Sequence, residues 1–455
     1  MAKQDWTIRG TLRVRNTIDI IRETFGEFSP LAGVTVKVQV RSKVLTGWGT
    51  WATWGKLETN SNGFFSITKR KGSDRRQFRF KILLDDEDLR VKEGGSFSTN
   101  NDGFPIEVHG LDLTDKDWFE IFDDKDTGTE RKAGLHNLGN IDISAGRTRR
   151  LCEIWNLYQR AIDVMDDFGS RFKFKDKLVI KYPMNIGAIS YANPVNHHVY
   201  ISNSYDSDSR FVRASSVLLH ELMHIWSYDY SKGEFGMAYQ LAKHQDVHQG
   251  MRGDNSTREN TEFVPFMEGF AEWASIKLAR EICNRNVIMD ASVYDDGPHK
   301  PLSRAHISAP FRASERNYQN MDYSERGWYS FFNILCFKRL GHCDFNSNGT
   351  FAEPNLSGIN LRSKRIALSF KDVLEVFLKN SSAGLNDVLK KTEMNFDSFL
   401  NRAKKIHDVL DDEKIDEIKT YLDPNSTTNP NDLSTGDLKQ KYTIRTGPIR
   451  RFVRK

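Results

Sequence analysis

The feature that most constrains this chain is an apolar, helix-forming run that contains two histidines and one glutamate. It reads Val217-Leu-Leu-His220-Glu221-Leu-Met-His224-Ile-Trp226. Residues four apart lie one above the other on one face of a helix, so both imidazoles can reach a single metal ion. Glu221 points about a third of a turn away from that line and can face a metal-bound water without ligating the metal. The run predicts a metal-binding helix from residue 212 to about residue 228.

A third protein ligand is needed, because a catalytic zinc ion takes three and leaves the fourth position to water. A histidine six residues after His224 would give one class of site, but that position is Tyr230. A glutamate on a second helix is the other common solution. The segment that begins at Phe263 carries Glu268 and Glu272, four apart in an otherwise apolar helical stretch. Two acids on a buried helix face require cationic partners, and zinc and an imidazole would serve.

These two segments resemble the gluzincins, the zinc metallopeptidases with a His-Glu-x-x-His motif and a later glutamate. Met267-Glu-Gly-Phe-Ala-Glu272-Trp is similar to the Asn-Glu-Gly-Phe-Ala segment of their aminopeptidase branch. The resemblance implies that Glu268 binds Zn²⁺ with His220 and His224. It also implies that Glu272 orients the first histidine, by analogy with the thermolysin-like branch.

The resemblance further implies a tyrosine that stabilises the developing oxyanion. Tyr323 is our candidate and Tyr329 is next, although Tyr323-x-x-x-Gly327 is one residue longer than the aminopeptidase pattern. No Gly-x-Met-Glu-Asn segment precedes the motif helix. We therefore expect an endopeptidase rather than an aminopeptidase.

Glu221 has a defined role in this interpretation. It takes a proton from the zinc-bound water as that water attacks a carbonyl, and it passes the proton to the leaving amine. Two alternatives stay open: a catalytically silent gluzincin-like binding protein, and a zinc hydrolase of a non-peptide amide. A binding protein has no use for a base at Glu221, which favours the peptidase.

The first hundred residues have the alternating pattern of β-strands. The apolar–polar runs are Thr11–Arg15, Val34–Val40, Phe64–Ile67 and Phe78–Ile82. Ser29-Pro-Leu-Ala-Gly-Val-Thr-Val-Lys-Val38 and Thr59-Asn-Ser-Asn-Gly-Phe-Phe-Ser-Ile67 resemble the transthyretin-like, carboxypeptidase-regulatory-like sandwich, which implies an accessory module. Trp48, Trp51 and Trp54 form either a sugar- or protein-binding patch or, as we prefer, sandwich core with one exposed edge.

From Arg149 the period changes to that of a helix, which we expect to reach Phe168. Residues 177–182 and 198–202 follow as strands. Helix, strand, edge strand and zinc helix is the order of a zincin catalytic domain, and the resemblance implies that strand 198–202 is the edge that holds a peptide. We interpret His197 and His198 as edge-strand residues rather than ligands.

The expected fold is therefore multidomain: an N-terminal all-β sandwich, then an α+β zincin-type (thermolysin-like) catalytic domain with a helical C-terminal subdomain. The predicted bounds are 1–110 for the sandwich, 111–148 for a connecting segment, 149–360 for the catalytic domain and 361–455 for the helical subdomain with a basic tail. Within the last part we expect helices at 370–378, 396–409 and 415–422.

Composition agrees with a globular protein: 455 residues, 38% hydrophobic, 28% charged, net charge +5. We expect a protein or peptide substrate, no nucleic acid and no membrane span; the oligomeric state stays open. Met1-Ala-Lys-Gln-Asp-Trp6 lacks the apolar core of a secretory signal. A removed signal or non-standard export, to the periplasm or medium, is slightly favoured over the cytoplasm.

Three further patterns have ordinary structural interpretations. His244 and His248 are four apart without a neighbouring acid, which favours a solvated helix face over a second metal site. Asp344–Gly349 opens like a calcium loop, but its twelfth position is Asn355, which favours a turn. Residues 285–322 are long, polar and irregular, which favours a functional loop.

Overall fold

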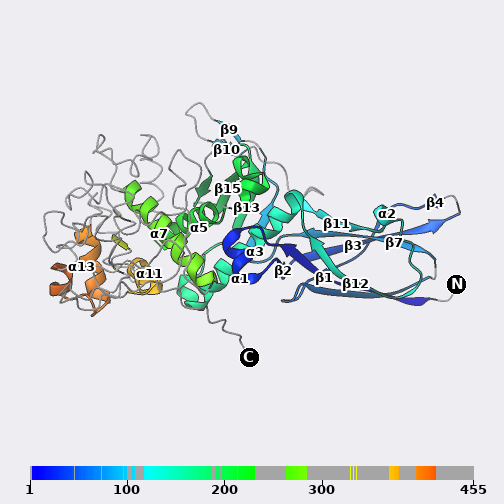
Figure 1. Ribbon diagram of the computed structural model, residues 1–455, viewed down its shortest axis with the longest axis horizontal. Helices are drawn as coiled ribbons and strands as arrows, with labels where there is room; N and C mark the ends of the chain where they lie inside the picture. Colours follow the sequence, from blue (N-terminus) through cyan, green and yellow to red (C-terminus); the bar gives the residue numbers. More distant parts are fainter. Residues whose placement is uncertain are drawn as a thin grey trace, which may run out of the picture. The chain divides into compact units, whose positions relative to one another are not determined.

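The computed structural model of the chain contains a β-rich N-terminal region followed by helical parts (Figure 1). It describes residues 3–45, 47–72, 74–95, 97–99, 105–107, 117–186, 190–194, 196–212, 214–230, 263–283, 328, 331–332, 335, 368–378 and 396–416. The chain divides into two compact units. The first comprises Met1–Asp229 with Glu281–Cys283, and the second comprises Tyr230–Arg280 with Asn284–Lys455.

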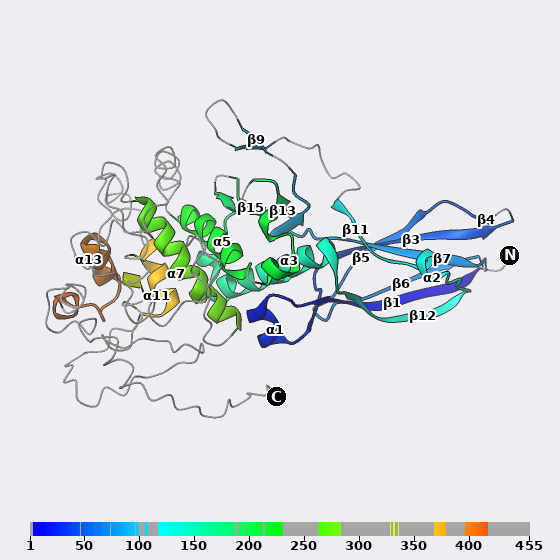
Figure 2. The same cartoon turned by 45° about the horizontal axis from the view of Figure 1, so that its top comes forward.

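Two sheets form a sandwich at the start of the first unit, with β1 and β12 on one side and β3 and β11 on the other (Figure 2). One sheet has the order β12-β1-β2 with β6 beside β1, and the other has the order β11-β7-β3-β4 with β5 beside β3. The strands are β1 (Gln4–Arg15), β2 (Phe28–Pro30), β3 (Thr35–Val44), β4 (Gly47–Trp48), β5 (Ala52–Glu58), β6 (Phe64–Lys71), β7 (Arg76–Leu83), β11 (Phe119–Asp123) and β12 (Gly134–Ile143). Helix α2 (Asp124–Thr127) follows β11.

Alternation decides which side chains fill the sandwich. Ile8 of β1, Val36 of β3 and Phe80 of β7 are fully buried, as expected for inward positions with a period of two. Trp6 of β1 lies 6.0 Å from Phe78 of β7, measured between ring centroids, so the sheets meet through aromatic side chains. The strands predicted from the sequence at 11–15, 34–40, 64–67 and 78–82 are confirmed.

Residues 119–143 differ from the connecting segment that the sequence led us to expect. Strand β12 pairs in parallel with β1, and β11 pairs antiparallel with β7, so this stretch adds one strand to each sheet. Glycines and acidic residues made the stretch look like a linker. Its pairing depends on partners more than 100 residues away in the case of β12, which local patterning does not reveal. The predicted domain bounds themselves stay predictions.

Outside the sandwich, the first unit contains a four-stranded mixed sheet with the order β14-β15-β13-β8. Its strands are β8 (Leu89–Lys92), β13 (Leu178–Met184), β14 (Tyr191–Asn193) and β15 (His198–Ser202). Strand β15 pairs with β13 in parallel and with β14 antiparallel. The expectation that strand 198–202 is the edge is therefore wrong. Among the described strands the edges of this sheet are β14, beside β15, and β8 at the other side. Strand β14 is too short to be recognised from its own residues.

Helix α3 (Gly146–Asp167) packs against β1 and β8, so it joins the sandwich to this mixed sheet. Its Arg149 and Glu153 form a buried ion pair at 2.9 Å. Glu153 also accepts hydrogen bonds from the Thr17 hydroxyl at 2.8 Å and from the Ile18 amide at 3.2 Å. These groups tie the end of β1 to the helix, and each buried charge has a partner, as burial requires.

The first unit contains further short elements: α1 (Asp19–Phe25), β9 (Phe97–Thr99), β10 (Pro105–Glu107), the 3₁₀ helices η2 (Ser170–Phe172) and η3 (Asn203–Tyr205), and α4 (Asp208–Phe211). The longer helix α5 (Ser215–Tyr230) follows, and only its last residue belongs to the second unit. The predicted motif helix is confirmed as α5, although residues 208–211 form a separate short helix before it.

Among the described residues the second unit is helical: α7 (Phe263–Cys283, whose last three residues belong to the first unit), α11 (Phe370–Leu378) and α13 (Phe396–Ile406). Helix α11 has the predicted bounds, whereas α13 ends three residues before the predicted residue 409. Phe266 and Phe270 of α7 lie 5.9 Å and 4.5 Å from Phe377 of α11, measured between ring centroids. No helix in the described part of the chain combines the length and apolarity needed to cross a membrane.

Lys181 supplies a test of the mixed sheet that contains β13. It lies on β13 opposite Lys92 of β8 and is 3% exposed. Its pKa is lowered to about 7, mainly by burial and additionally by the positive charges of Lys92 and Arg90. In the unfolded chain the pKa of Lys181 is near 10.5. Between pH 7 and pH 10.5 the unfolded chain therefore binds one more proton than the folded protein. The free energy of unfolding should therefore rise with pH from about 7 to about 10, at a slope of at most about 1.4 kcal/mol per pH unit.

Lys181→Met should remove this slope and stabilise the protein at pH 6.5, as measured by urea unfolding from pH 6.5 to 9.5. Lys132→Met, at an exposed position, is the control and should leave the slope unchanged. Equal pH dependence in wild type and Lys181→Met would contradict the assignment.

Candidate metal centre

Helix α5 carries the motif histidines and is buried on nearly every side. Fourteen of its residues are buried, among them His220, Glu221 and His224. A helix that is apolar on all sides is expected to be buried in a hydrophobic core. The few polar side chains of α5 are buried in the core as well. Burying imidazole and carboxylate groups costs free energy unless they find partners, so the composition of α5 already points to a polar site inside the first unit.

Hydrogen bonds hold α5 at both ends. The Tyr158 hydroxyl of α3 donates to the Leu218 carbonyl at 2.8 Å, and Trp226 Nε1 donates to the Phe172 carbonyl at 2.8 Å. Asp229 accepts from the Lys175 amide at 3.0 Å. The contacts fix the depth and rotation of the helix, and therefore the direction of the motif side chains.

His197 provides a further anchor. It is buried, and its Nε2 lies 2.6 Å from Asp229 Oδ1 at the end of α5. Its backbone is left-handed, with φ of 54°, a conformation in which histidine is enriched among non-glycine residues. His197 thus ties the start of β15 to the motif helix. The sequence offered no signal for this pair, because its members are distant along the chain.

The motif histidines point at one another. Their Nε2 atoms are 3.0 Å apart and the rings are nearly perpendicular, at 85° with centroids 4.6 Å apart. Two nitrogens bound to one zinc ion at about 2.0–2.1 Å in tetrahedral geometry lie about 3.3 Å apart. The observed separation is close to that value, so the histidine pair fits a shared ion.

Two tyrosines lie within electrostatic reach of Glu221. Burial first, and the charge of Glu221 second, raises the pKa of Tyr158 and of Tyr191. Both hydroxyls therefore keep their protons at neutral pH. Tyr191 stands on the edge strand β14 and stacks on Tyr200 of β15, with ring centroids 5.4 Å apart. The sequence did not single out Tyr191, since β14 itself was missed.

The two carboxylates of α7 are buried as the sequence predicted. Glu268 is 1% exposed and Glu272 is 4% exposed. Their neighbours Phe270, Ala271 and Trp273 are fully buried. The two carboxylates are therefore not on a solvent-exposed face of α7. Each one requires a cationic or hydrogen-bonding partner.

Among the described residues, His220, His224 and Glu268 form a group whose ligand atoms all lie within 4.8 Å of one another. Two imidazoles and one carboxylate suit zinc in a catalytic site. The same donor set also suits non-haem iron(II). The donors are therefore compatible with a resident metal ion but do not by themselves identify it.

Asp372, Glu375 and His407 form a second group in the described residues. Asp372 has a structural role, because its Oδ2 accepts from the amide and hydroxyl of Ser369, at 2.8 Å each, in a reciprocal cap of α11. His407 Nε2 lies 2.8 Å from the Asp372 carbonyl oxygen. Helix capping accounts for the position of Asp372, and we assign no metal to this group.

Several predicted positions lie outside the described residues. They are the oxyanion candidates Tyr323 and Tyr329, the pair His244 and His248, the loop 285–322, the turn Asp344–Gly349 and the tail from Arg445. Cys152 and Cys283, which are described, are buried thiols rather than members of a disulfide.

Comparisons with known proteins give little for this chain. Neither protein-family models nor curated proteins gave a match. A comparison with solved structures matched a 9R-lipoxygenase from Cyanothece PCC8801 at 14% identity and a TM-score of 0.15, over 31% of this chain and 16% of the lipoxygenase chain. A similarity of this size carries no argument about fold or function.

The histidine geometry predicts tight metal binding. We expect the purified protein to hold one equivalent of a divalent transition metal, measured by inductively coupled plasma mass spectrometry. Chelation should lower the Tm, because an ion that binds only the folded state stabilises it. His220→Ala and His224→Ala should each abolish retention.

His136→Ala removes a histidine of the sandwich and should retain the metal. A protein that purifies without metal, binds none on titration and keeps its Tm with a chelator would contradict the prediction.

Proposed function

We propose that the protein is a zinc-dependent peptidase, which hydrolyses a peptide bond with water that Glu221 activates. The observation that carries the proposal is the buried motif helix α5, on which two Nε2 atoms lie 3.0 Å apart beside a buried glutamate. In this proposal His220, His224 and Glu268 hold the ion, which the grouping of their ligand atoms supports. Glu272, four residues after Glu268, orients a histidine ligand.

A bound zinc ion supplies Lewis acidity, which lowers the pKa of a water ligand to about 7 and polarises a carbonyl. The residues of the chain then have separate roles. Glu221 accepts the proton of the attacking water and delivers it to the amine that leaves. Because Glu221 is 6% exposed, its carboxylate is poorly hydrated, which strengthens its interaction with that proton.

The edge strand β14 supplies a place for an extended substrate. Strand β14 pairs with β15 on one side only among the described strands. An extended peptide can add to such an edge through backbone hydrogen bonds. Tyr191, which lies within reach of the charge of Glu221, is part of this strand. Peptide cleavage within a chain, rather than from its amino terminus, agrees with such binding, and we propose an endopeptidase of the gluzincin type.

Two other functions share the metal site. A silent binding protein would hold the ion and a partner without turnover, and a hydrolase of non-peptide amides would use the same base on a different substrate. Glu221 disfavours the first, because a binding protein gains nothing from a buried base. The extended edge disfavours the second, because a small amide does not use it.

The direct test of the base is Glu221→Gln. We expect the variant to retain the metal and the fold but to lose at least about 100-fold in cleavage of casein and of a mixed peptide library, the upper range for general-base catalysis being about 10⁴-fold. Glu27→Gln, an exposed glutamate of the same unit, should cleave normally. Cleavage by Glu221→Gln at the wild-type rate, or bound iron in place of zinc, would overturn the proposal.

The third ligand has a separate test. Glu268→Ala should lose the metal during dialysis under conditions in which the wild-type protein retains it, because one of the three protein ligands is removed. Glu272→Ala should retain it with an affinity reduced by about 10- to 100-fold. Metal content and competition with a chelating dye measure both. Stoichiometric zinc in Glu268→Ala would show that another residue is the third ligand.

A further inference from the structure

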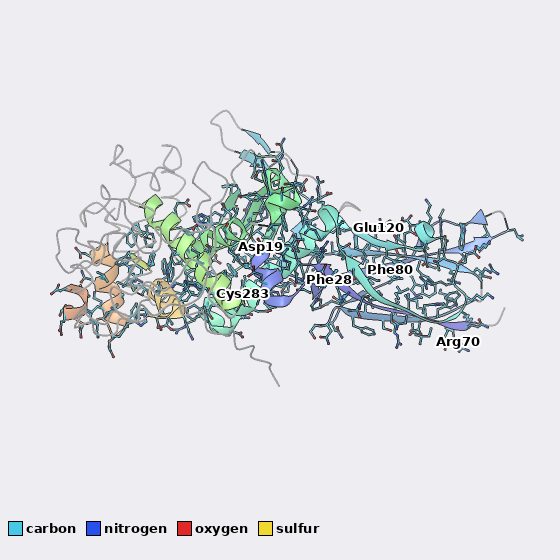
Figure 3. All side chains as sticks on the ribbon, in the orientation of Figure 1. Asp19, Phe28, Arg70, Phe80, Glu120 and Cys283 are labelled. Atoms are coloured by element: carbon cyan, nitrogen blue, oxygen red, sulfur yellow. The ribbon has the colours of Figure 1, made fainter. Side chains whose placement is uncertain are left out.

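Arg402 is a buried cation on helix α13 of the second unit. Helices α11 and α13 lie side by side, and side chains from both fill the space between them (Figure 3). Arg402 is 8% exposed, and its Nε donates a hydrogen bond to the Val376 carbonyl oxygen of α11 at 2.7 Å. Val376 stands in the last turn of α11, where carbonyl groups lack partners within the helix. A cation is favourable at this end of a helix.

The other two nitrogens of this guanidinium group are not satisfied. Nη1 and Nη2 of Arg402 are both buried, and in the described part of the chain neither has a hydrogen-bond partner. Burial alone lowers the pKa of Arg402 to about 10, and no carboxylate among the described residues raises it again. Arg402 is therefore protonated at neutral pH, and the described side chains leave its positive charge without an anionic partner.

The first unit treats its buried ionic groups differently. The fully buried carboxylate of Asp124 accepts from Nε and Nη2 of Arg131 at 2.8 Å and 2.7 Å. Arg149, which is also fully buried, pairs with Glu153 at 2.9 Å. A buried charge without such a partner is strongly destabilising. The environment of Arg402 therefore calls for an anion that the described residues do not supply.

The geometry of the guanidinium group indicates which anion fits. The hydrogen bond from Nε to Val376 fixes the plane of the group. Nη1 and Nη2 then form a planar fork, which matches the two oxygens of one carboxylate. Because the fork is already oriented, a ligand would lose little additional entropy of the side chain on binding.

We infer that Arg402 is the centre of a binding site for a small organic monocarboxylate, whose two oxygens accept hydrogen bonds from Nη1 and Nη2. One negative charge neutralises one guanidinium group, whereas a phosphate group carries about −1.5 to −2 at pH 7 and would leave a buried excess. Leu400 and Ala403 of α13 and Phe377 of α11 are at most 1% exposed. Such apolar neighbours favour an organic anion over an inorganic one. The inference does not rest on the metal centre or on the proposed peptidase activity.

The test uses the full-length protein, prepared in chloride buffer without carboxylates. Isothermal titration calorimetry and the Tm are measured with sodium acetate, butyrate and benzoate, and sodium phosphate and sodium chloride at equal ionic strength are the comparison anions. We expect at least one carboxylate to bind with a stoichiometry of one, more tightly than phosphate. It should raise the Tm by about 3 °C at a hundredfold excess over its Kd, while chloride has no such effect.

Variants of Arg402 connect the binding to the fork. Arg402→Met should abolish the response to carboxylates, and its Tm without ligand should stay level or rise because a buried charge without a partner is removed. Arg402→Lys keeps the charge but lacks the fork, so the affinity should fall by about tenfold or more. This variant tests the fork even if Arg402→Met does not fold.

Lys405→Met is the matched control, because it removes one positive charge from an exposed position of the same helix. Its affinity for the carboxylate should change less than about twofold. The inference would be overturned by the absence of binding for all three carboxylates, by tighter binding of phosphate, or by an equal loss in Lys405→Met. It would also fail if Arg402→Met lowered the Tm while the wild-type Tm did not respond to carboxylates, because Arg402 would then serve only as a cap of α11.

Discussion

The burial of α5 is the constraint on which the rest of the first unit depends. An apolar helix that is enclosed on nearly all sides brings two imidazoles and a carboxylate into a region from which water is excluded. Each polar group there costs free energy unless a partner compensates it. The first unit meets this requirement by pairing His220 with His224 through facing Nε2 atoms. A shared cation would satisfy both nitrogens at once, which is why the pair supports a metal centre better than a packing role.

The surroundings of α5 define the positions of its side chains closely enough for chemistry. Tyr158, Trp226 and Asp229 anchor the helix through hydrogen bonds to or from three different segments. The bonds of Tyr158 and Trp226 are buried and therefore persistent, because breaking them would leave polar groups without water. His197 adds the start of β15 to the same assembly. The helix that carries the histidine pair is thus held from both ends by the sheet and by α3, and the scaffold determines the positions of its side chains.

The sandwich shows the opposite use of polar residues. Its interior follows the strict alternation of apolar side chains, while its outer face accepts opposed lysines and arginines that lie over indole rings. Acidic residues also stand on these strands, since Glu120 lies opposite Lys81 in the register of β11 and β7. Aromatic rings, glutamines and acids of the sandwich itself hold these cations, as half-buried charges require.

The sequence alone determined the features that depend on local spacing. Histidines four apart predicted a ligand pair on one helix face, and the alternating runs predicted the main strands of the sandwich, because both periods are properties of a single element. The burial of Glu268 and Glu272 also followed from their apolar neighbours. Only the tertiary structure decided which strands meet. Among the described strands it placed β14 outside β15 at the sheet edge, added β11 and β12 to the two sheets of the sandwich, and paired His197 with Asp229. Those contacts join residues that are distant in sequence, and no local pattern specifies a partner that lies elsewhere in the chain.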